Sequence, residues 1–202
     1  MVKQHIILAA GWIVFCLLHS LLAGISLKQW MTRKLGNHFR YYRLYYTLFA
    51  FINFGLVIFY QVRLVSPYVF SPTAISYTLG FFLGISGLLI MAVCIKKYFN
   101  NLSGLKTLFI NEIKSGNTLI VTGIHRYVRH PLYSGTFLFI WGLFIFIPYT
   151  SLLISNFIIT IYTLIGISFE EEKLIREFGA SYKTYQKKVP KIIPTFRPSS
   201  AN

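Results

Sequence analysis

Five long apolar runs constrain what this chain can fold into more than any other feature. They cover residues 6–27, 44–65, 75–95, 132–148 and 151–169. A helix needs roughly 20 mostly apolar residues to cross a bilayer, and each run meets or approaches that length. Only 12% of the residues are charged, against about a quarter in a soluble domain. The sequence therefore predicts an all-α integral membrane protein with five transmembrane helices, forming a single membrane domain over residues 1–202.

The last two apolar runs are separated only by Pro148, Tyr149 and Thr150. Proline cannot continue a helix without losing a backbone hydrogen bond, so a turn is expected here. The two runs should then form a helical hairpin of antiparallel neighbours. The hairpin would bring the start of the fourth span and the end of the fifth span to the same side of the membrane.

The basic residues predict the orientation of the chain. Eighteen of the 20 Lys and Arg residues fall in three segments, 28–43, 96–129 and 173–197. Because Lys and Arg in short loops stay in the cytosol, five spans place the N-terminus outside and the C-terminus inside. The net charge of +15 is explained by this topology and by anionic membrane lipid rather than by nucleic acid, since the cations lie between apolar runs.

Two further elements are expected outside the spans. The third loop, 96–131, predicts an interfacial connector: a short helix, a turn at Ser115-Gly116-Asn117 and an extended segment over 118–122. After the fifth span, apolar residues recur at threes and fours with Lys and Arg opposite them. This pattern predicts a cytosolic amphipathic helix over about 170–189.

Polar residues inside the spans are few. They include His19, Ser20, Asn53, Gln61 and Asn156, which we interpret as partners in interhelical hydrogen bonds. A continuous polar path for ions is not expected. The two cysteines lie in apolar runs without CxxC spacing, so no metal site and no disulfide is predicted.

The segment 122–135, TGIHRYVRHPLYSG, places two imidazoles, two guanidiniums and two phenols at the start of an apolar helix. An alternative interpretation is a juxtamembrane anchor, since basic and aromatic residues collect at the ends of spans. At the end of the fifth span stand Glu170, Glu171 and Glu172, three of the five acids in the chain. An alternative for these is the N-terminal cap of a new helix. The hairpin favours a facing acid and base pair in a polar pocket at the cytosolic membrane surface.

Such a pocket suits a zwitterionic cofactor with a cationic centre, and S-adenosylmethionine fits that description. We predict that Arg129 pairs with a carboxylate of the cofactor or substrate, because the guanidinium fork matches that geometry. Glu170 or Glu171 should accept from the ammonium or ribose hydroxyls, and only one should face the pocket directly, since adjacent helical side chains diverge. Gly80, Gly84 and Gly87 indicate either close helix packing or room for a ligand.

The motifs RHPLYSG (129–135) and EEEKLIREFGASYKTYQKKVPKIIP (170–194) resemble the isoprenylcysteine carboxyl methyltransferase family, which includes relatives of phosphatidylethanolamine methyltransferase. The front half, with FCLLHSLLA and YYRLYY, is more similar to its methanethiol S-methyltransferase branch. The resemblance implies a site for S-adenosylmethionine at the cytosolic ends of the last two spans. It implies catalytic roles for Arg129, Glu170 and Glu171, and cofactor contacts from these three together with His130, Tyr133, Gly84 and Gly87. His125 and Lys191 depart from the usual family residues and are left out of the predicted site.

We therefore predict a membrane methyltransferase that moves a methyl group from S-adenosylmethionine to a small or lipophilic thiol, carboxylate or amine. One alternative is an NADPH-dependent reductase of the steroid 5α-reductase type. Those proteins typically carry Asn and Glu in the segment where this chain has HPLYSG. The other alternative is a non-catalytic, lipid-binding membrane scaffold, which would not bind the methyl donor.

Overall fold

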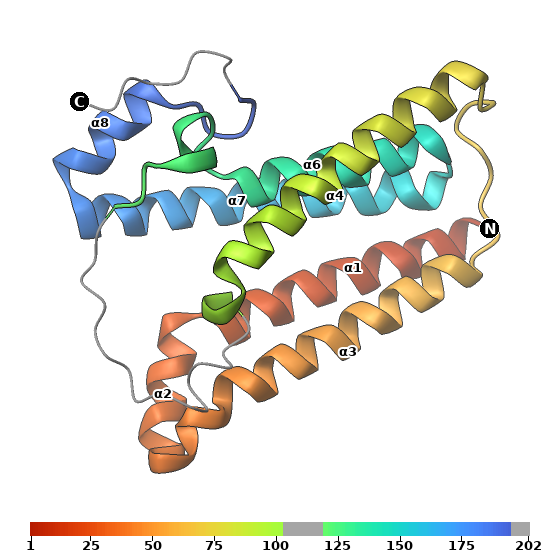
Figure 1. Cartoon of the computed structure of the whole chain (residues 1–202). Coiled ribbons are helices and arrows are strands. Elements are labelled where there is room, and N and C mark those ends of the chain that lie inside the picture. The colour runs from red at the N-terminus through yellow and green to blue at the C-terminus, as the bar shows by residue number, and fades with distance from the viewer. Residues whose placement is uncertain (103–118, 195–202) are drawn as a thin grey trace. The chain divides into compact units, whose positions relative to one another are not determined.

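The computed structural model of the chain describes residues 1–102 and 119–194 (Figure 1). Its α-helices are α1 (Val2–Ala23), α2 (Ile25–Leu35), α3 (Tyr42–Arg63), α4 (Ala74–Leu102), α6 (Pro131–Phe146), α7 (Thr150–Phe178) and α8 (Ala180–Lys188), with short 3-10 helices η1 (Gly36–Tyr41) and η2 (Gly123–Arg126). An isolated bridge pairs Tyr68 with Tyr149, and the rest of the regular structure in these ranges is helical. The prediction of an all-α protein is confirmed for the described residues.

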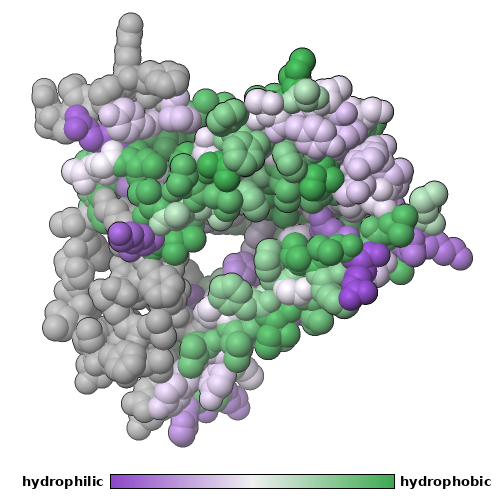
Figure 2. Space-filling view, turned by 45° about the vertical axis from the view of Figure 1, so that its right-hand side comes forward, coloured by the Kyte–Doolittle hydropathy of each residue, from purple (hydrophilic) through white to green (hydrophobic). Residues whose placement is uncertain are grey.

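Four of the helices are long and apolar enough to cross a membrane. They are α1, α3 from Leu44, α4 as far as Lys96, and α7. Large apolar side chains are exposed along them, for example Leu17, Phe51 and Phe82, and Figure 2 shows such side chains over much of the visible face. The chain is an integral membrane protein. Helix α6 has 16 residues, which extend about 24 Å, short of the roughly 30 Å of a hydrocarbon core.

The described chain divides into two compact units. One contains residues 1–71, 98–102 and 148–159, and the other contains 72–97, 119–147 and 160–194. Helix α7 is continuous and contributes its first ten residues to one unit and the remainder to the other. The prediction of a single membrane domain stays a prediction.

Buried hydrogen bonds join three helical segments within the first unit. The indole N–H of Trp12 on α1 donates to Oε1 of Gln61 on α3 at 3.0 Å. The hydroxyl of Ser155, in the first part of α7, donates to the same oxygen at 2.8 Å. All three residues are buried. The prediction that Gln61 makes interhelical hydrogen bonds is therefore confirmed.

Replacing Gln61 with leucine is expected to lower the free energy of unfolding by about 1–3 kcal/mol, because the buried Trp12 N–H would lose its acceptor. The measurement is a thermal unfolding curve of the detergent-solubilised protein. Asn53→Leu is the matched control, since the Asn53 amide donates to the carbonyl of Phe49 on its own helix. Equal melting temperatures for the two variants would contradict the proposed importance of the Gln61 contact.

Glycines hold α4 and α6 in backbone contact within the second unit. A Cβ placed on Gly87 would lie 2.5 Å from the carbonyl oxygen of Gly135, and one on Gly80 would lie 2.7 Å from that of Gly142. Conversely, a Cβ on Gly142 would lie 2.5 Å from the backbone nitrogen of Gly84. The two helix backbones therefore meet at glycines, which have no side chains to keep them apart. The predicted close packing is confirmed for Gly80 and Gly87.

Helices α6 and α7 form the predicted hairpin. Within the second unit the Trp141 indole N–H donates to the hydroxyl of Thr160 at 3.1 Å, and Nε2 of His130 lies 3.2 Å from Oε1 of Glu171. The two contacts are eleven residues apart on each helix, 130 to 141 on α6 and 160 to 171 on α7. Equal spacing in opposite directions is what two antiparallel α-helices require. Pro148 lies in the connection between the helices.

Two expected boundaries are wrong. The first apolar run does not continue to residue 27: α1 ends at Ala23, and Gly24, with ψ 142°, separates it from α2. No helix begins at residue 170: α7 continues to Phe178, and Gly179, with φ 55°, precedes the separate helix α8. Of the predicted connector, residues 96–102 are the last part of α4, and Thr122, the last residue of the expected extended segment, is extended with φ −104° and ψ 165°. The turn at 115–117 lies outside the described residues.

Candidate active site

The basic segment reaches the start of α6 through η2 and a short loop. Pro131 is the first residue of α6, a position where the missing N–H of proline costs nothing because helical N–H groups there have no intrahelical partner. His130 is the N-cap residue, with φ −120° and ψ 67°. The residue before a proline is kept out of the helical region by steric clash. The sequence R-H-P therefore ends the loop at His130 and fixes the backbone position from which the His130 side chain extends.

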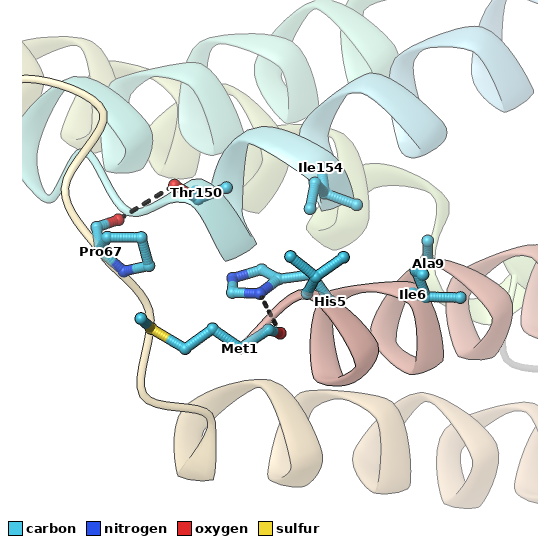
Figure 3. A pocket seen from close by; sticks show the side chains of 8 residues that line it. Met1, His5, Ile6, Ala9, Pro67, Thr150 and Ile154 are labelled. Atoms are coloured by element: carbon cyan, nitrogen blue, oxygen red, sulfur yellow. Dashed lines mark hydrogen bonds between the residues drawn. The ribbon is translucent and has the colours of Figure 1, made fainter.

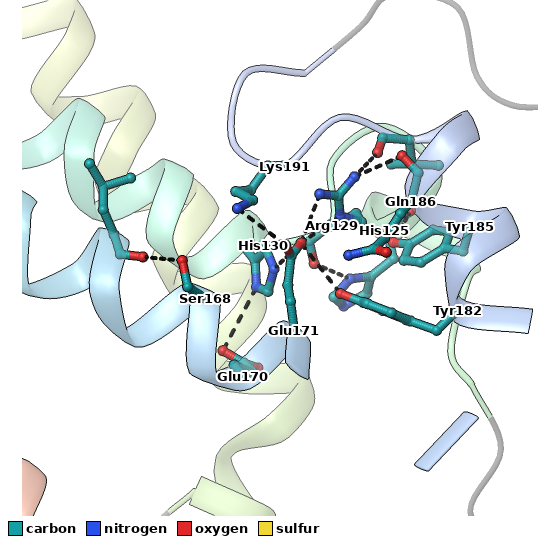
Figure 4. A network of polar contacts seen from close by, with 12 residues as sticks. His125, Arg129, His130, Ser168, Glu170, Glu171, Tyr182, Tyr185, Gln186 and Lys191 are labelled. Carbon is teal, nitrogen blue, oxygen red and sulfur yellow. Dashed lines mark hydrogen bonds and ion pairs between the residues drawn. The ribbon is translucent and has the colours of Figure 1, made fainter. Parts of the chain in front are cut away.

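Glu171 on α7 is the centre of the site (Figure 4). Its Oε1 accepts from Nε of Arg129 at 2.8 Å and lies 2.7 Å from Nη2 of the same guanidinium. His130 Nε2 lies 3.2 Å from this oxygen, and Nζ of Lys191 lies 3.2 Å from Oε2. The side chains of Arg129 and Glu171 are each only 9% exposed. A buried carboxylate with several cationic or donor partners is held in its ionised form.

Glu170 lies beside this centre and is much more open. Its side chain is 45% exposed, and its Oε2 is 3.8 Å from Nδ1 of His130. The ring of Tyr133, one turn into α6, lies 5.8 Å from the His130 ring between centroids. Because adjacent positions on a helix point in different directions, only one of the two glutamates can occupy the buried position. The structure places Glu171 there.

The segment 189–192 holds the Arg-His-Pro loop in place. The backbone N–H of Arg129 donates to the carbonyl of Pro190 at 2.9 Å, and that of His130 donates to the carbonyl of Lys191 at 3.1 Å. The Nη1 group of Arg129 donates to the carbonyls of Gln186 and Val189. The guanidinium thus joins the loop both to α7, through Glu171, and to the end of α8.

Two tyrosines on α8 complete this arrangement, and the sequence analysis did not include them in the site. The hydroxyl of Tyr182 donates to Oε1 of Glu171 at 3.5 Å, and that of Tyr185 donates to the carbonyl of His125 at 2.7 Å. Tyr182 is 1% exposed. Burial, followed by the negative charge of Glu171, raises the pKa of Tyr182 above its ordinary value, so the phenol remains a donor. Their spacing of three residues places both on one face of a helix.

Only some of the predicted site residues lie together in the structure. The structure brings Arg129, His130 and Glu171 into one buried cluster with Glu170 and Tyr133 at its side. Gly84 and Gly87 lie on α4, where Gly87 packs against α6, whereas the space where a Gly84 side chain would lie is open. Lys191, which was left out of the predicted site, contacts Glu171. This contact depends on how residues 189–192 return to the Arg-His-Pro loop, which no local pattern in the sequence shows.

A separate apolar cavity of about 520 Å³ lies in the first unit (Figure 3). Its lining includes Met1, His5, Ile6, Pro67 and Ile154. Nδ1 of His5 is bonded to the carbonyl of Met1 and Nε2 to the hydroxyl of Ser66. The lining carries no acid and base pair, so this cavity does not suit a zwitterion. The charged cluster around Glu171 is the candidate active site.

Comparison with known proteins relates this site to a family of enzymes. The sequence model of the family described as phospholipid methyltransferase matches residues 75–181. The chain is 30% identical over 191 residues to a methanethiol S-methyltransferase of Crocosphaera subtropica, covering 90% of this chain and 71% of that protein. It is 29% identical to methanethiol S-methyltransferase 2 of Bradyrhizobium diazoefficiens, with coverage of 90% and 70%. No solved structure gives a significant match.

A shorter match relates the chain to an isoprenylcysteine enzyme. The chain is 42% identical over 84 residues to the protein-S-isoprenylcysteine O-methyltransferase of Schizosaccharomyces pombe, covering 38% of this chain and 33% of that protein. A membrane protein with these relatives is a membrane methyltransferase. The chain belongs to the phospholipid methyltransferase family, with relatives among the methanethiol and isoprenylcysteine enzymes. The predicted family is confirmed, and the reductase and scaffold alternatives receive no support.

Proposed function

We propose that the chain transfers a methyl group from S-adenosylmethionine to a small or lipophilic acceptor, and that the cluster around Glu171 holds the methyl donor. The observation that supports this most directly is the donor set. A half-exposed carboxylate, Glu170, and a half-exposed ammonium, Lys191, flank a buried ionised core. A zwitterionic amino-acid group needs an anion for its ammonium and a cation for its carboxylate, so these residues fit it.

The roles proposed for the site residues follow from their environments. Arg129 and Glu171 form the buried pair that fixes the start of α6, with His130 between the two glutamates. Glu170 accepts from the ammonium or ribose hydroxyls, and Tyr133 borders the same site. When bound, the sulfonium supplies an electrophilic methyl group, so the protein mainly positions the reactants and excludes water.

We propose a topology of five crossings, although α6 is shorter than a full span. The hairpin supports this: His130 lies opposite Glu171, directly after the apolar part of α7, and only residues 147–149 separate α6 from α7. Helix α6 and residues 147–149 therefore cover the same depth as the apolar part of α7. With five crossings, the basic segments place the N-terminus outside and the site at the cytosolic surface.

We propose a thiol as the first acceptor to test. The two relatives that align with 90% of this chain are named for methanethiol. A neutral thiol must lose its proton before or during transfer, whereas a carboxylate acceptor need not. The isoprenylcysteine enzyme aligns only with 38% of the chain, so the carboxylate class is the second candidate.

Incubating the purified protein in detergent or vesicles with methyl-labelled S-adenosylmethionine and methanethiol is expected to give labelled dimethyl sulfide. Calorimetric titrations with S-adenosylhomocysteine and with NADPH accompany the assay, and only the former is expected to bind. If an incubation with membrane extract labels a product other than dimethyl sulfide, the acceptor is that other compound and the proposed thiol acceptor is wrong. Binding of NADPH and not of S-adenosylhomocysteine would refute the proposed cofactor.

A further inference from the structure

The guanidinium of Arg129 has little capacity left to bind a ligand. Its Nε and Nη2 both contact Oε1 of Glu171, and Nη1 donates to the carbonyls of Gln186 and Val189. These contacts engage four of the five N–H donors that an arginine carries. The side chain is 9% exposed. Arg129, which the sequence suggested as the partner of a carboxylate, is thus committed to bonds within the protein.

Lys191 is the cation of the cluster that is open to a ligand. Its side chain is 40% exposed, more than four times the value for Arg129. Nζ contacts Oε2 of Glu171 at 3.2 Å. An ammonium carries three N–H donors in a flexible arrangement, so this contact leaves donors for a second anion.

The backbone of Lys191 fixes where the ammonium can act. Its carbonyl accepts the N–H of His130, and the preceding carbonyl, of Pro190, accepts the N–H of Arg129. The residue is therefore attached to the loop that begins α6. Oε2 of Glu170 lies 3.8 Å from Nδ1 of the same His130, so residues bearing both half-exposed charges contact His130, Lys191 through its carbonyl and Glu170 through its side chain (Figure 4).

We infer that Lys191 binds the amino-acid carboxylate of the methyl donor, while Arg129 acts as a positioning residue. This inference rests on the proposed function and identifies a specificity-determining residue within it. Glu170 provides the opposite charge for the ammonium of the same group. A ligand without the carboxylate would gain nothing from Lys191.

The test is equilibrium binding of two ligands to the detergent-solubilised full chain: S-adenosylhomocysteine and its analogue in which hydrogen replaces the carboxylate. The wild-type protein is expected to prefer the first by about 10- to 100-fold, the range for a hydrogen bond between charged groups. Lys191→Met is expected to bind both with similar affinity, and Lys191→Arg to keep most of the preference. Lys188→Ala, which removes an exposed lysine of α8, is the matched control and should retain it.

The outcomes separate this inference from the proposed function. If Lys191→Met keeps the wild-type preference, or if the wild-type protein has no preference, Lys191 does not bind the carboxylate while the methyl donor can still be the cofactor. If the wild-type protein binds neither ligand, the proposed function and this inference are both refuted. A thermal unfolding curve for each variant shows whether the site remains folded, since the Lys191 side chain also contacts Glu171.

Discussion

Glu171→Ala is expected to reduce methyl transfer by roughly a hundredfold or more, the largest effect of any single substitution in the site. The change would leave Arg129, His130 and Lys191 without the carboxylate that they share. Removing one partner of a buried ion pair costs about 3–5 kcal/mol of folding free energy, so the cluster would lose its arrangement around the methyl donor. A hundredfold loss in rate corresponds to about 2.7 kcal/mol of lost transition-state stabilisation. The measurement is the initial rate of label transfer at matched protein amounts, together with the melting temperature.

Glu172→Ala is the matched control on the next residue of α7. Its side chain is 60% exposed and lies 3.4 Å from Arg176, which is 81% exposed. Exposed pairs of this kind contribute little to stability, so activity and melting temperature should remain near the wild-type values. If Glu171→Ala and Glu172→Ala lose activity to a similar extent, activity depends on α7 as a whole and not on the buried cluster.

Gly87→Ala is expected to destabilise the packing of α4 against α6. The added methyl group would lie 2.5 Å from the carbonyl oxygen of Gly135 and 2.5 Å from the backbone nitrogen of Phe139. Backbone atoms cannot move aside as a side chain can, so α4 and α6 would have to separate. Overpacking of this kind typically costs about 1–3 kcal/mol. Thermal unfolding of the detergent-solubilised protein measures the difference.

Gly84→Ala provides the comparison within the same helix. No atom lies within 4 Å of a Cβ built on Gly84, and alanine is favoured over glycine inside a helix by about 1 kcal/mol. The two variants should therefore shift the melting temperature in opposite directions. A loss of stability in Gly84→Ala equal to that in Gly87→Ala would refute the backbone contact as the cause.

Hydrophobic length predicted the main helices well, because a span must cover a fixed thickness of bilayer. The expected runs 44–65 and 75–95 correspond to α3 and α4, and the turn at Pro148 correctly separated α6 from α7. Helix α2 was not expected, since its residues Ile25–Leu35 are amphipathic and too few to span. The change from an apolar to an amphipathic pattern at residue 170 was interpreted as a new helix, although α7 continues until Gly179.

The facing acid and base groups were predictable, but their partners were not. Counting equal steps from the turn at 147–149 would place His130 opposite Gly166, five residues before its observed partner Glu171. No local pattern shows that Arg129 binds the carbonyls of Gln186 and Val189, because these contacts depend on how the chain returns after α8. Buried Tyr182 is likewise fixed by that return. Spacing within one helix can be derived from sequence, whereas contacts made across a turn need the fold.

The attachment of residues 189–192 to the Arg-His-Pro loop affects the order in which the enzyme can mature during synthesis. The spanning helices among the described residues precede this segment, so they can enter the bilayer while the ribosome has yet to add it. A chain stopped by a nonsense codon at position 189 would still contain these helices. Such a product would be inserted in the membrane yet lack the carbonyls that hold Arg129 and His130 in place.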